Sequence, residues 1–205
     1  MGSEAEAQVE AKVAIREVIE NWAIWRDSGD FENLATCFHD DGRMIATWFA
    51  GSAAQFIAGC KAGFEKGAIV QHFLGGVSIS LAGTRAIAQT KMMILSRSSL
   101  EDMPCDTTCV GRFYDFFEER NGRWAIVLRQ PIYEKDRFDM LDPAHQPKLD
   151  PQLLNRFPVG YRFMGYAQTK EGRTVNPSLP GLHGAEIERL YGEGNAWLAG
   201  KNLAR

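Results

Sequence analysis

The sequence lacks the features of membrane proteins, zinc proteins and nucleotide-binding proteins. Its 205 residues contain no run of 18 apolar residues, so no segment suits a transmembrane helix. The four cysteines form no C-x-x-C pair and only four histidines are present, which argues against a zinc site or a disulfide scaffold. No glycine-rich phosphate loop occurs. We therefore expect no bound metal, no membrane contact and a reducing environment in which the cysteines form no disulfides.

The charge is balanced rather than dominated by one sign. Lysine and arginine total 23, aspartate and glutamate total 26, and the net charge is −3. A mildly acidic chain has no field that collects nucleic acid, so we expect no nucleic-acid partner. The first twelve residues are too polar for a secretory signal, and we expect a cytoplasmic protein.

Proline is scarce until residue 140 and common afterwards. Six of the eight prolines follow Met140, and such a segment is unsuited to a sheet. We therefore divide the chain into a domain over 1–140 and a Pro-rich extension over 141–205. The extension is expected to run extended over the surface and to end in a helix over 184–199.

Within the first 140 residues, the spacing of apolar residues changes from a helical to a strand-like period. Helices are predicted over 6–28, 30–38 and 52–66, with a turn at 39–42 and a short strand over 44–49. Long strands are predicted over 69–81, with a bulge at Gly75-Gly76, and over 84–97, 107–119 and 124–133. Asn121-Gly122 is a strong hairpin signal. This order predicts an α+β fold, a curved antiparallel sheet with the N-terminal helices packed on its concave face.

Asp27 is the first residue that could take part in catalysis. It continues the i, i+4 ridge of Ile15, Ile19 and Ala23, whose apolar members are expected to face the sheet. The alternative is a solvated acid in a helix-stop sequence.

His72 lies near the start of the first long strand, in the sequence QHFLGG. A neutral imidazole is the commonest general base near pH 7, and a carboxylate usually fixes its tautomer. Asp27 could serve if the helix end lies across that strand. The alternative is a histidine buried in the core for packing.

Arg129 lies in the last predicted strand, on the face shared by Ala125 and Val127. A cation there could stabilise developing negative charge or a leaving group. Alternatively it is an edge arginine paired with an acid such as Glu134. Arg97 and Arg112 are weaker candidates of the same kind.

These patterns together resemble the SnoaL-like branch of the nuclear-transport-factor-2-like superfamily. The resemblance rests on WRDSGDF around Asp27, on QHFLGG around His72 and on the NGRW hairpin at 121–124, and it covers residues 8–139. It implies a cone-shaped barrel with an interior pocket and cofactor-free chemistry. Scytalone dehydratases and hexachlorocyclohexane dehydrochlorinases are the most similar members.

In the eliminating members an Asp–His pair acts as general base, and Asp27 and His72 fall on those positions. An arginine of the last strand assists the departing group in the dehydrochlorinases, and Arg129 matches it. The scytalone-specific residues differ: two tyrosines are replaced by Arg26 and Ala46, and a histidine falls near Arg97. Trp22 takes the place of the dehydrochlorinase lysine, so neither of those substrates is expected.

The function predicted from the sequence is a cofactor-independent lyase of dehydratase type, acting on a small aromatic substrate. Asp27, His72 and Arg129 are the expected catalytic residues. The residues expected to bind the substrate are Trp22, Arg26, Trp48, Phe73, Arg97 and Phe113. Alternatives are carbon–carbon cleavage that releases formaldehyde from a lignin-type dimer, an isomerase or cyclase, and a non-catalytic binding module. We also expect a homo-oligomer, a dimer or trimer, because long strands would leave a face to cover.

Overall fold

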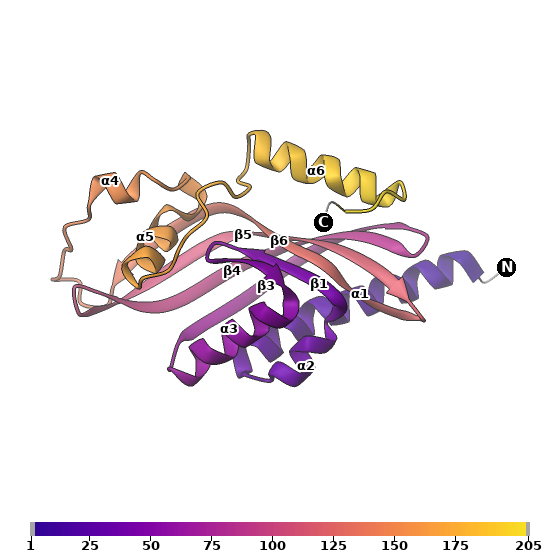
Figure 1. Cartoon of the computed structure of the whole chain (residues 1–205), viewed down its shortest axis with the longest axis horizontal. Coiled ribbons are helices and arrows are strands. Elements are labelled where there is room, and N and C mark those ends of the chain that lie inside the picture. The colour runs from indigo at the N-terminus through magenta and orange to yellow at the C-terminus, as the bar shows by residue number, and fades with distance from the viewer. Residues whose placement is uncertain (1–2, 204–205) are drawn as a thin grey trace.

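A computed structural model describes residues 3–203 of the chain. Helices α1 (Ser3–Ser28), α2 (Phe31–Thr36) and α3 (Ala53–Glu65) lie on one side of a single sheet, and α6 (Ala185–Leu198) lies on the other (Figure 1). We call the side toward α1–α3 the inner face and the side toward α6 the outer face. None of the helices within this range is long and apolar enough to cross a membrane.

The sheet has six strands in the order β2-β1-β6-β5-β4-β3. Their bounds are β1 Phe38–Ala46, β2 Phe49–Ser52, β3 Ile69–Ala82, β4 Arg85–Leu100, β5 Met103–Arg120 and β6 Arg123–Met140. All neighbours are antiparallel except β1 and β6, which pair in parallel. The predicted α+β fold with a curved sheet is confirmed, and the sheet is mixed and remains open.

Three local sequence signals produce the hairpin turn, the bulge and the helix start that they predict. Asn121 and Gly122 have φ of 54° and 74°, the two successive positive values that a tight hairpin needs between β5 and β6. The pairing of β3 with β4 shifts register between Leu74 and Val77, so Gly75-Gly76 forms the predicted bulge. The Asp30 side chain accepts a hydrogen bond from the Asn33 N–H and thereby starts α2.

The segment over 39–42 was wrongly predicted to be a turn, because it lies inside β1. Its partner register on β6 shifts between Phe38 and Arg43, so the extra residues are taken up by an irregularity within the strand. Gly42 makes this possible, since a Cβ there would lie 2.7 Å from the His39 carbonyl oxygen. The predicted strand over 44–49 is in fact the end of β1 and the start of β2.

The core lies between α1 and the inner face of the sheet. Ile15, Ile19 and Ala23 are at most 5% exposed, which confirms that this ridge of α1 faces the sheet. Trp22 is buried beside them and contacts Phe56 of α3 and Phe113 of β5. The same ridge continues to Asp27, which therefore reaches the sheet at its end.

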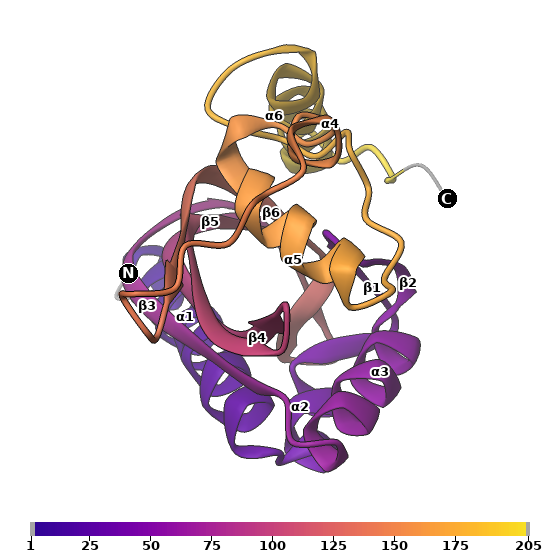
Figure 2. The same cartoon turned by 90° about the vertical axis from the view of Figure 1, so that its left-hand side faces the viewer.

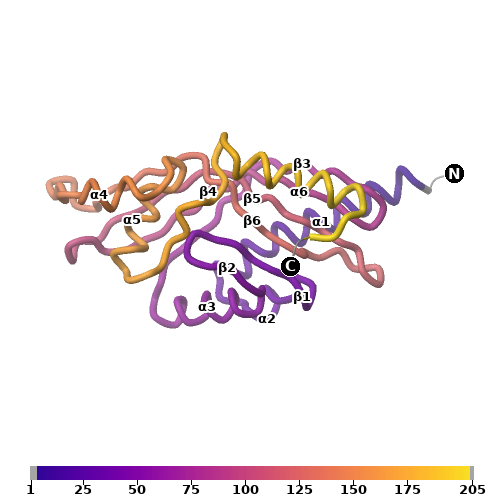
Figure 3. Tube along the Cα trace, turned by 45° about the horizontal axis from the view of Figure 1, so that its top comes forward, coloured from indigo at the N-terminus to yellow at the C-terminus, as the bar shows by residue number. Residues whose placement is uncertain are grey.

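The segment after Met140 does more than run over the surface, and that prediction was wrong in part. It contains α4 (Pro151–Leu154), a 3₁₀ turn η1 (Val159–Tyr161) and α5 (Arg162–Lys170) before the expected final helix (Figure 3). The main core also includes side chains from this segment: Phe157, Tyr161, Met164, Val175 and Leu179. Apolar residues spaced between the prolines therefore dock the segment onto the domain.

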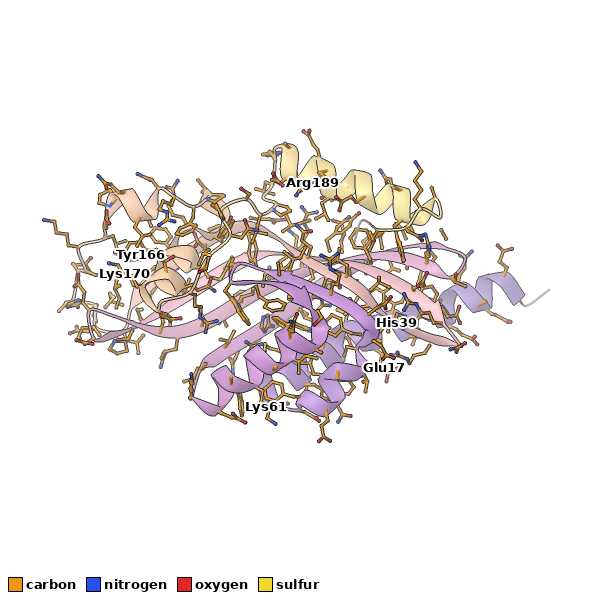
Figure 4. The ribbon with its side chains drawn as sticks, in the orientation of Figure 1. Glu17, His39, Lys61, Tyr166, Lys170 and Arg189 are labelled. Carbon is orange, nitrogen blue, oxygen red and sulfur yellow. The ribbon has the colours of Figure 1, made fainter. Side chains whose placement is uncertain are left out.

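Helix α6 covers part of the outer face. Ile187, Leu190 and Trp197 pack there in a second apolar cluster with Phe116 and Leu128 of the sheet. The Trp197 indole N–H donates to the Phe117 carbonyl oxygen at 3.2 Å. The polar side of the helix faces away from the sheet, where Figure 4 labels the exposed Arg189.

Candidate active site

A cavity of about 270 Å³ lies between the inner face of the sheet, the C-terminal end of α1, helix α3 and helix α5. Its volume is slightly below the range of about 300–1,000 Å³ that is usual for small-molecule sites. In Figure 2, α5 crosses the front of the curved sheet, and residues of α5 are among the lining side chains. Access to the cavity is therefore shaped by the segment that follows Met140.

Asp27 and His72 meet in this cavity. Asp27 Oδ1 lies 2.8 Å from the Nδ1 atom of His72, and Asp27 Oδ2 accepts the His72 backbone N–H at 2.5 Å. The two side chains are only 17% and 7% exposed. Within the described residues no protein group bonds to His72 Nε2, so this nitrogen is available to a ligand.

The surroundings of His72 favour the neutral ring. Burial lowers the pKa of His72 below its ordinary value, and the hydrogen bond and charge of Asp27 only partly oppose this. A neutral ring whose Nδ1–H donates to a carboxylate presents an unprotonated Nε2. The arrangement is therefore suited to removing a proton from a bound molecule.

Aromatic side chains form the walls around the pair. The Trp22 ring meets the His72 ring edge-on at 5.2 Å, and the Phe113 ring lies 6.0 Å from the His72 ring and 5.2 Å from the Trp22 ring. Trp48 stacks on Phe56 at 5.7 Å. The structure thus places Trp22, Trp48 and Phe113 at the cavity, together with Phe56, which the sequence analysis did not select as a wall residue.

Arg26 lines the cavity next to the pair. Its Nη1 atom makes two long contacts of 3.3 Å, one to Asp27 Oδ1 and one to the Val70 carbonyl oxygen. Its Nε atom is buried without a partner in the described chain. Arg26 therefore retains hydrogen-bond donors that the protein does not use.

Unlike Arg26, Arg129 lies in the core. It is fully buried and forms a two-bonded ion pair with Asp115 on the adjacent strand, with both bonds at 2.7 Å. Its guanidinium carbon lies 4.3 Å from the Trp22 ring centre and 4.2 Å from that of Phe113. It is not among the residues that line the cavity. The acid that pairs with it is Asp115, whereas Glu134 binds Arg112 and Lys91.

Two further predicted residues lie at the edge of the cavity or outside it. Arg97 lines the cavity but is held by Asp106 through two hydrogen bonds of 2.7 Å. Phe73 is 60% exposed and does not line the cavity. As the neighbour of His72 in a strand, Phe73 must face the opposite side of the sheet.

Several lining residues were missed from the sequence. Tyr133 lines the cavity on the same side of β6 as Pro131, and burial raises the pKa of its hydroxyl. Ser96 and Thr107 are in register with Val70, two residues before His72. Strand alternation counted from His72 could have found these positions, but only once the register was known. The residues contributed by α5 had no such signal.

The remaining polar residues offer no comparable site. No group of three metal-ligating side chains occurs within residues 3–203. His39 lies far from α5 along the sheet, and its Nε2 contacts the Glu118 carbonyl oxygen at 2.8 Å (Figure 4). All four cysteines are buried free thiols.

Comparison with known proteins identifies the family. Residues 7–130 match the SnoaL-like domain. The chain belongs to the SnoaL-like family. Two curated fungal relatives align with 94% of this chain and 87% of their own length: Pea pathogenicity protein 2 of Fusarium vanettenii, at 34% identity over 203 residues, and an uncharacterized protein of Emericella nidulans, at 32% over 208. These alignments extend into the segment after Met140.

Several solved structures share the fold. A scytalone dehydratase-like protein from Novosphingobium aromaticivorans superposes with a TM-score of 0.57 at 16% identity, covering 72% of this chain and 97% of that one. A type 2 hexachlorocyclohexane dehydrochlorinase gives 0.58 at 13% identity, covering 71% and 98%. The predicted resemblance is confirmed at the level of the fold. At 16% and 13% identity these two likenesses show the fold alone.

Proposed function

We propose that this SnoaL-like protein is a cofactor-independent lyase in which His72, oriented by Asp27, removes a proton from a small aromatic substrate. The observation that carries the proposal is the Asp27–His72 pair inside an aromatic-walled cavity, with Nε2 unpartnered. A base positioned in this way contributes about 10²–10⁴-fold to a rate.

The elimination can be written with this one base. His72 Nε2 takes the proton from the carbon next to an activating ring or carbonyl, and the freed electron pair forms the new double bond. The hydroxyl on the neighbouring carbon leaves, takes the proton back from the imidazolium and departs as water. The products are the alkene and water, and His72 returns to its neutral form.

Arg26 is the group best suited to stabilise the negative charge that develops during proton removal. It lines the cavity beside the Asp27–His72 pair and has unused donors, as an electrostatic stabiliser requires. Arg129, predicted from the sequence to be catalytic, does not line the cavity, and in this proposal it is a positioning residue for the Trp22 and Phe113 rings. Both of those rings contact it, and both also contact His72.

The proposal is tested by turnover of a panel of small aromatic hydroxy ketones, followed by mass spectrometry. We expect loss of 18 mass units, and loss of that activity in His72→Ala. Unchanged product mass would assign the protein as an isomerase or cyclase, and loss of formaldehyde as a carbon–carbon lyase. Ligand binding without any turnover would assign it as a binding module.

We also propose that the protein forms a homo-oligomer through the part of the outer face that α6 leaves uncovered. Phe73 and Met93 are cross-strand neighbours there and are 60% and 36% exposed. Adjacent exposed apolar side chains favour association. Light scattering should give a multiple of 22.9 kDa, and a monomer would contradict this part of the proposal.

A further inference from the structure

One wall of the cavity comes from the segment that follows the family domain. Met164, Ala167, Gln168, Glu171 and Arg173 line the cavity. All of them lie beyond residue 130, where the SnoaL-like match ends. This wall therefore gives the cavity polar groups that the rest of the domain does not supply.

Arg173 is the cation of this wall. Its guanidinium carbon lies 5.0 Å from the centre of the Trp48 ring, which also lines the cavity. Its Nε atom is 3.4 Å from Glu171 Oε2, and the two side chains are 37% and 35% exposed. A contact of that length between partly exposed groups is weak. Among the described residues, no hydrogen bond from the guanidinium is found.

Arg26 faces the same cavity from the end of α1. Its side chain is 16% exposed and its two contacts are both long. The neighbouring carboxylate is already committed, because each oxygen of Asp27 accepts a shorter bond from His72. Arg26 is a largely buried cation that is ion-paired with Asp27 at 3.3 Å and keeps a buried Nε–H without a hydrogen-bond partner among the described residues.

The positive charges of Arg26 and Arg173 both affect the pKa of one group, the Cys60 thiol of α3. Burial raises the pKa of Cys60, and the charges of Arg26 and Arg173 oppose the rise. Cys60 itself lines the cavity. Arg97, the third arginine of the lining, is different because Asp106 occupies its guanidinium through two short bonds.

We infer that Arg26 and Arg173 form a binding site for the acidic group of an aromatic ligand, a carboxylate or an ionised phenol. The ring of this ligand lies against the wall formed by Trp22, Phe56 and Trp48. A planar oxyanion matches the planar donor fork of arginine, and the stacked rings supply apolar area. The inference names the substrate class for the proposed site but does not depend on proton transfer.

The test compares two probes of equal shape, 1-naphthoate and naphthalene-1-carboxamide, by isothermal titration calorimetry on the full chain. We expect the wild type to bind the carboxylate at least tenfold more tightly than the neutral amide. Arg173→Gln and Arg26→Gln should each reduce this preference about tenfold, while Arg173→Lys should retain part of it. Circular dichroism shows that each variant is folded.

The matched control is Lys170→Gln. Lys170 is a cation of α5 that lies over the Tyr166 ring at 5.6 Å and does not line the cavity (Figure 4). Its replacement should leave the preference unchanged. Equal binding of both probes by the wild type, absence of binding, or an unchanged preference in Arg173→Gln would overturn the inference.

Failure of this inference can be distinguished from failure of the proposed function. His72→Ala removes the base but neither arginine, so it should abolish turnover and keep the preference for the carboxylate. Turnover that depends on His72, with no preference for the acidic probe, would refute the arginine site alone.

Discussion

The carboxylate of Asp27 holds His72 by its ring and by its backbone at once. Oδ1 is 2.8 Å from the ring Nδ1, and Oδ2 accepts the backbone N–H at 2.5 Å. The first contact sets the tautomer of the ring. The second fixes strand β3 against the end of α1. The Asp27 carboxylate therefore determines both the orientation of the imidazole ring and the position of the strand that carries it.

Asp27→Asn is expected to lower turnover by about 10²–10⁴-fold, because the amide no longer holds the ring in the productive tautomer. The amide oxygen still accepts the backbone N–H of His72, so the free energy of unfolding should change by only about 1 kcal/mol. Steady-state kinetics and urea unfolding measure the two effects. The control is Asp40→Asn, an exposed acid of β1, and equal losses in both variants would contradict the prediction.

The activity should have an acid limb below pH 6.5. Burial lowers the pKa of His72 from its ordinary value of 6.5, so the base stays neutral at mildly acidic pH and protonates only below it. Protonation also costs folding free energy, because the unfolded chain binds this proton more readily. Stability from this group is therefore present above pH 6.5 and is lost as the pH falls. A pH profile of kcat/KM with its limb above 7 would refute this.

The buried pair of Arg129 and Asp115 should respond to single and double substitutions in different ways. Arg129→Met leaves an unpaired carboxylate in the core, where burial already raises the pKa of Asp115, and should cost about 3–5 kcal/mol of unfolding free energy. Adding Asp115→Leu removes that charge and should recover most of the loss. Urea unfolding of the three variants checks this. If the folded double variant retains full turnover, Arg129 has no part in catalysis.

Asp136 anchors the first turn of α5. Its Oδ2 accepts the backbone N–H groups of Phe163 and Met164 at 2.6 and 2.8 Å, and burial raises its pKa to about 6. The folded state therefore holds this proton more tightly than the unfolded state, and the stability contributed by protonation is lost as the pH rises from 3.8 to about 6. We expect Asp136→Asn to be at least as stable as the wild type above pH 6.

Asp136→Ala removes the acceptor of both N–H groups and should loosen α5. Limited proteolysis should then cleave the chain between residues 141 and 175 faster than in the wild type. Asp139→Ala provides the control, because the ion pair of Asp139 within residues 3–203 is with the exposed Arg137 of the same strand. Equal cleavage of the two variants would show that Asp136 does not anchor the helix.

The fold was predictable because its signals are local. The α1 ridge, the Asn121-Gly122 turn and the Gly75-Gly76 bulge each depend on residues close in sequence. The Asp27–His72 contact spans 45 positions. The sequence predicted it only on the condition that the helix end lies across the strand, and the family resemblance supported that condition. The surroundings of Arg129 were not predictable in the same way, because its partner Asp115 depends on the register of β5 with β6.

The α5 helix was not predicted from the sequence, for a related reason. Prolines before and after it suggested an extended chain, whereas its docking depends on Asp136 of a distant strand and on a cavity that no local pattern reveals. The residues that we infer to bind the acidic group of the ligand therefore lie partly in the segment with the weakest sequence signal.

Two glycines from distant parts of the chain approach consecutive carbonyls of β6. A Cβ at position 111 would lie 2.0 Å from the Ile132 oxygen, and a Cβ at position 160 would lie 2.0 Å from the Tyr133 oxygen. Any larger residue at either place would push its own backbone away from that strand. A glycine matching 160, two residues before an α5-like helix, therefore distinguishes homologous sequences that close their pocket with the same C-terminal segment from those that must use another element.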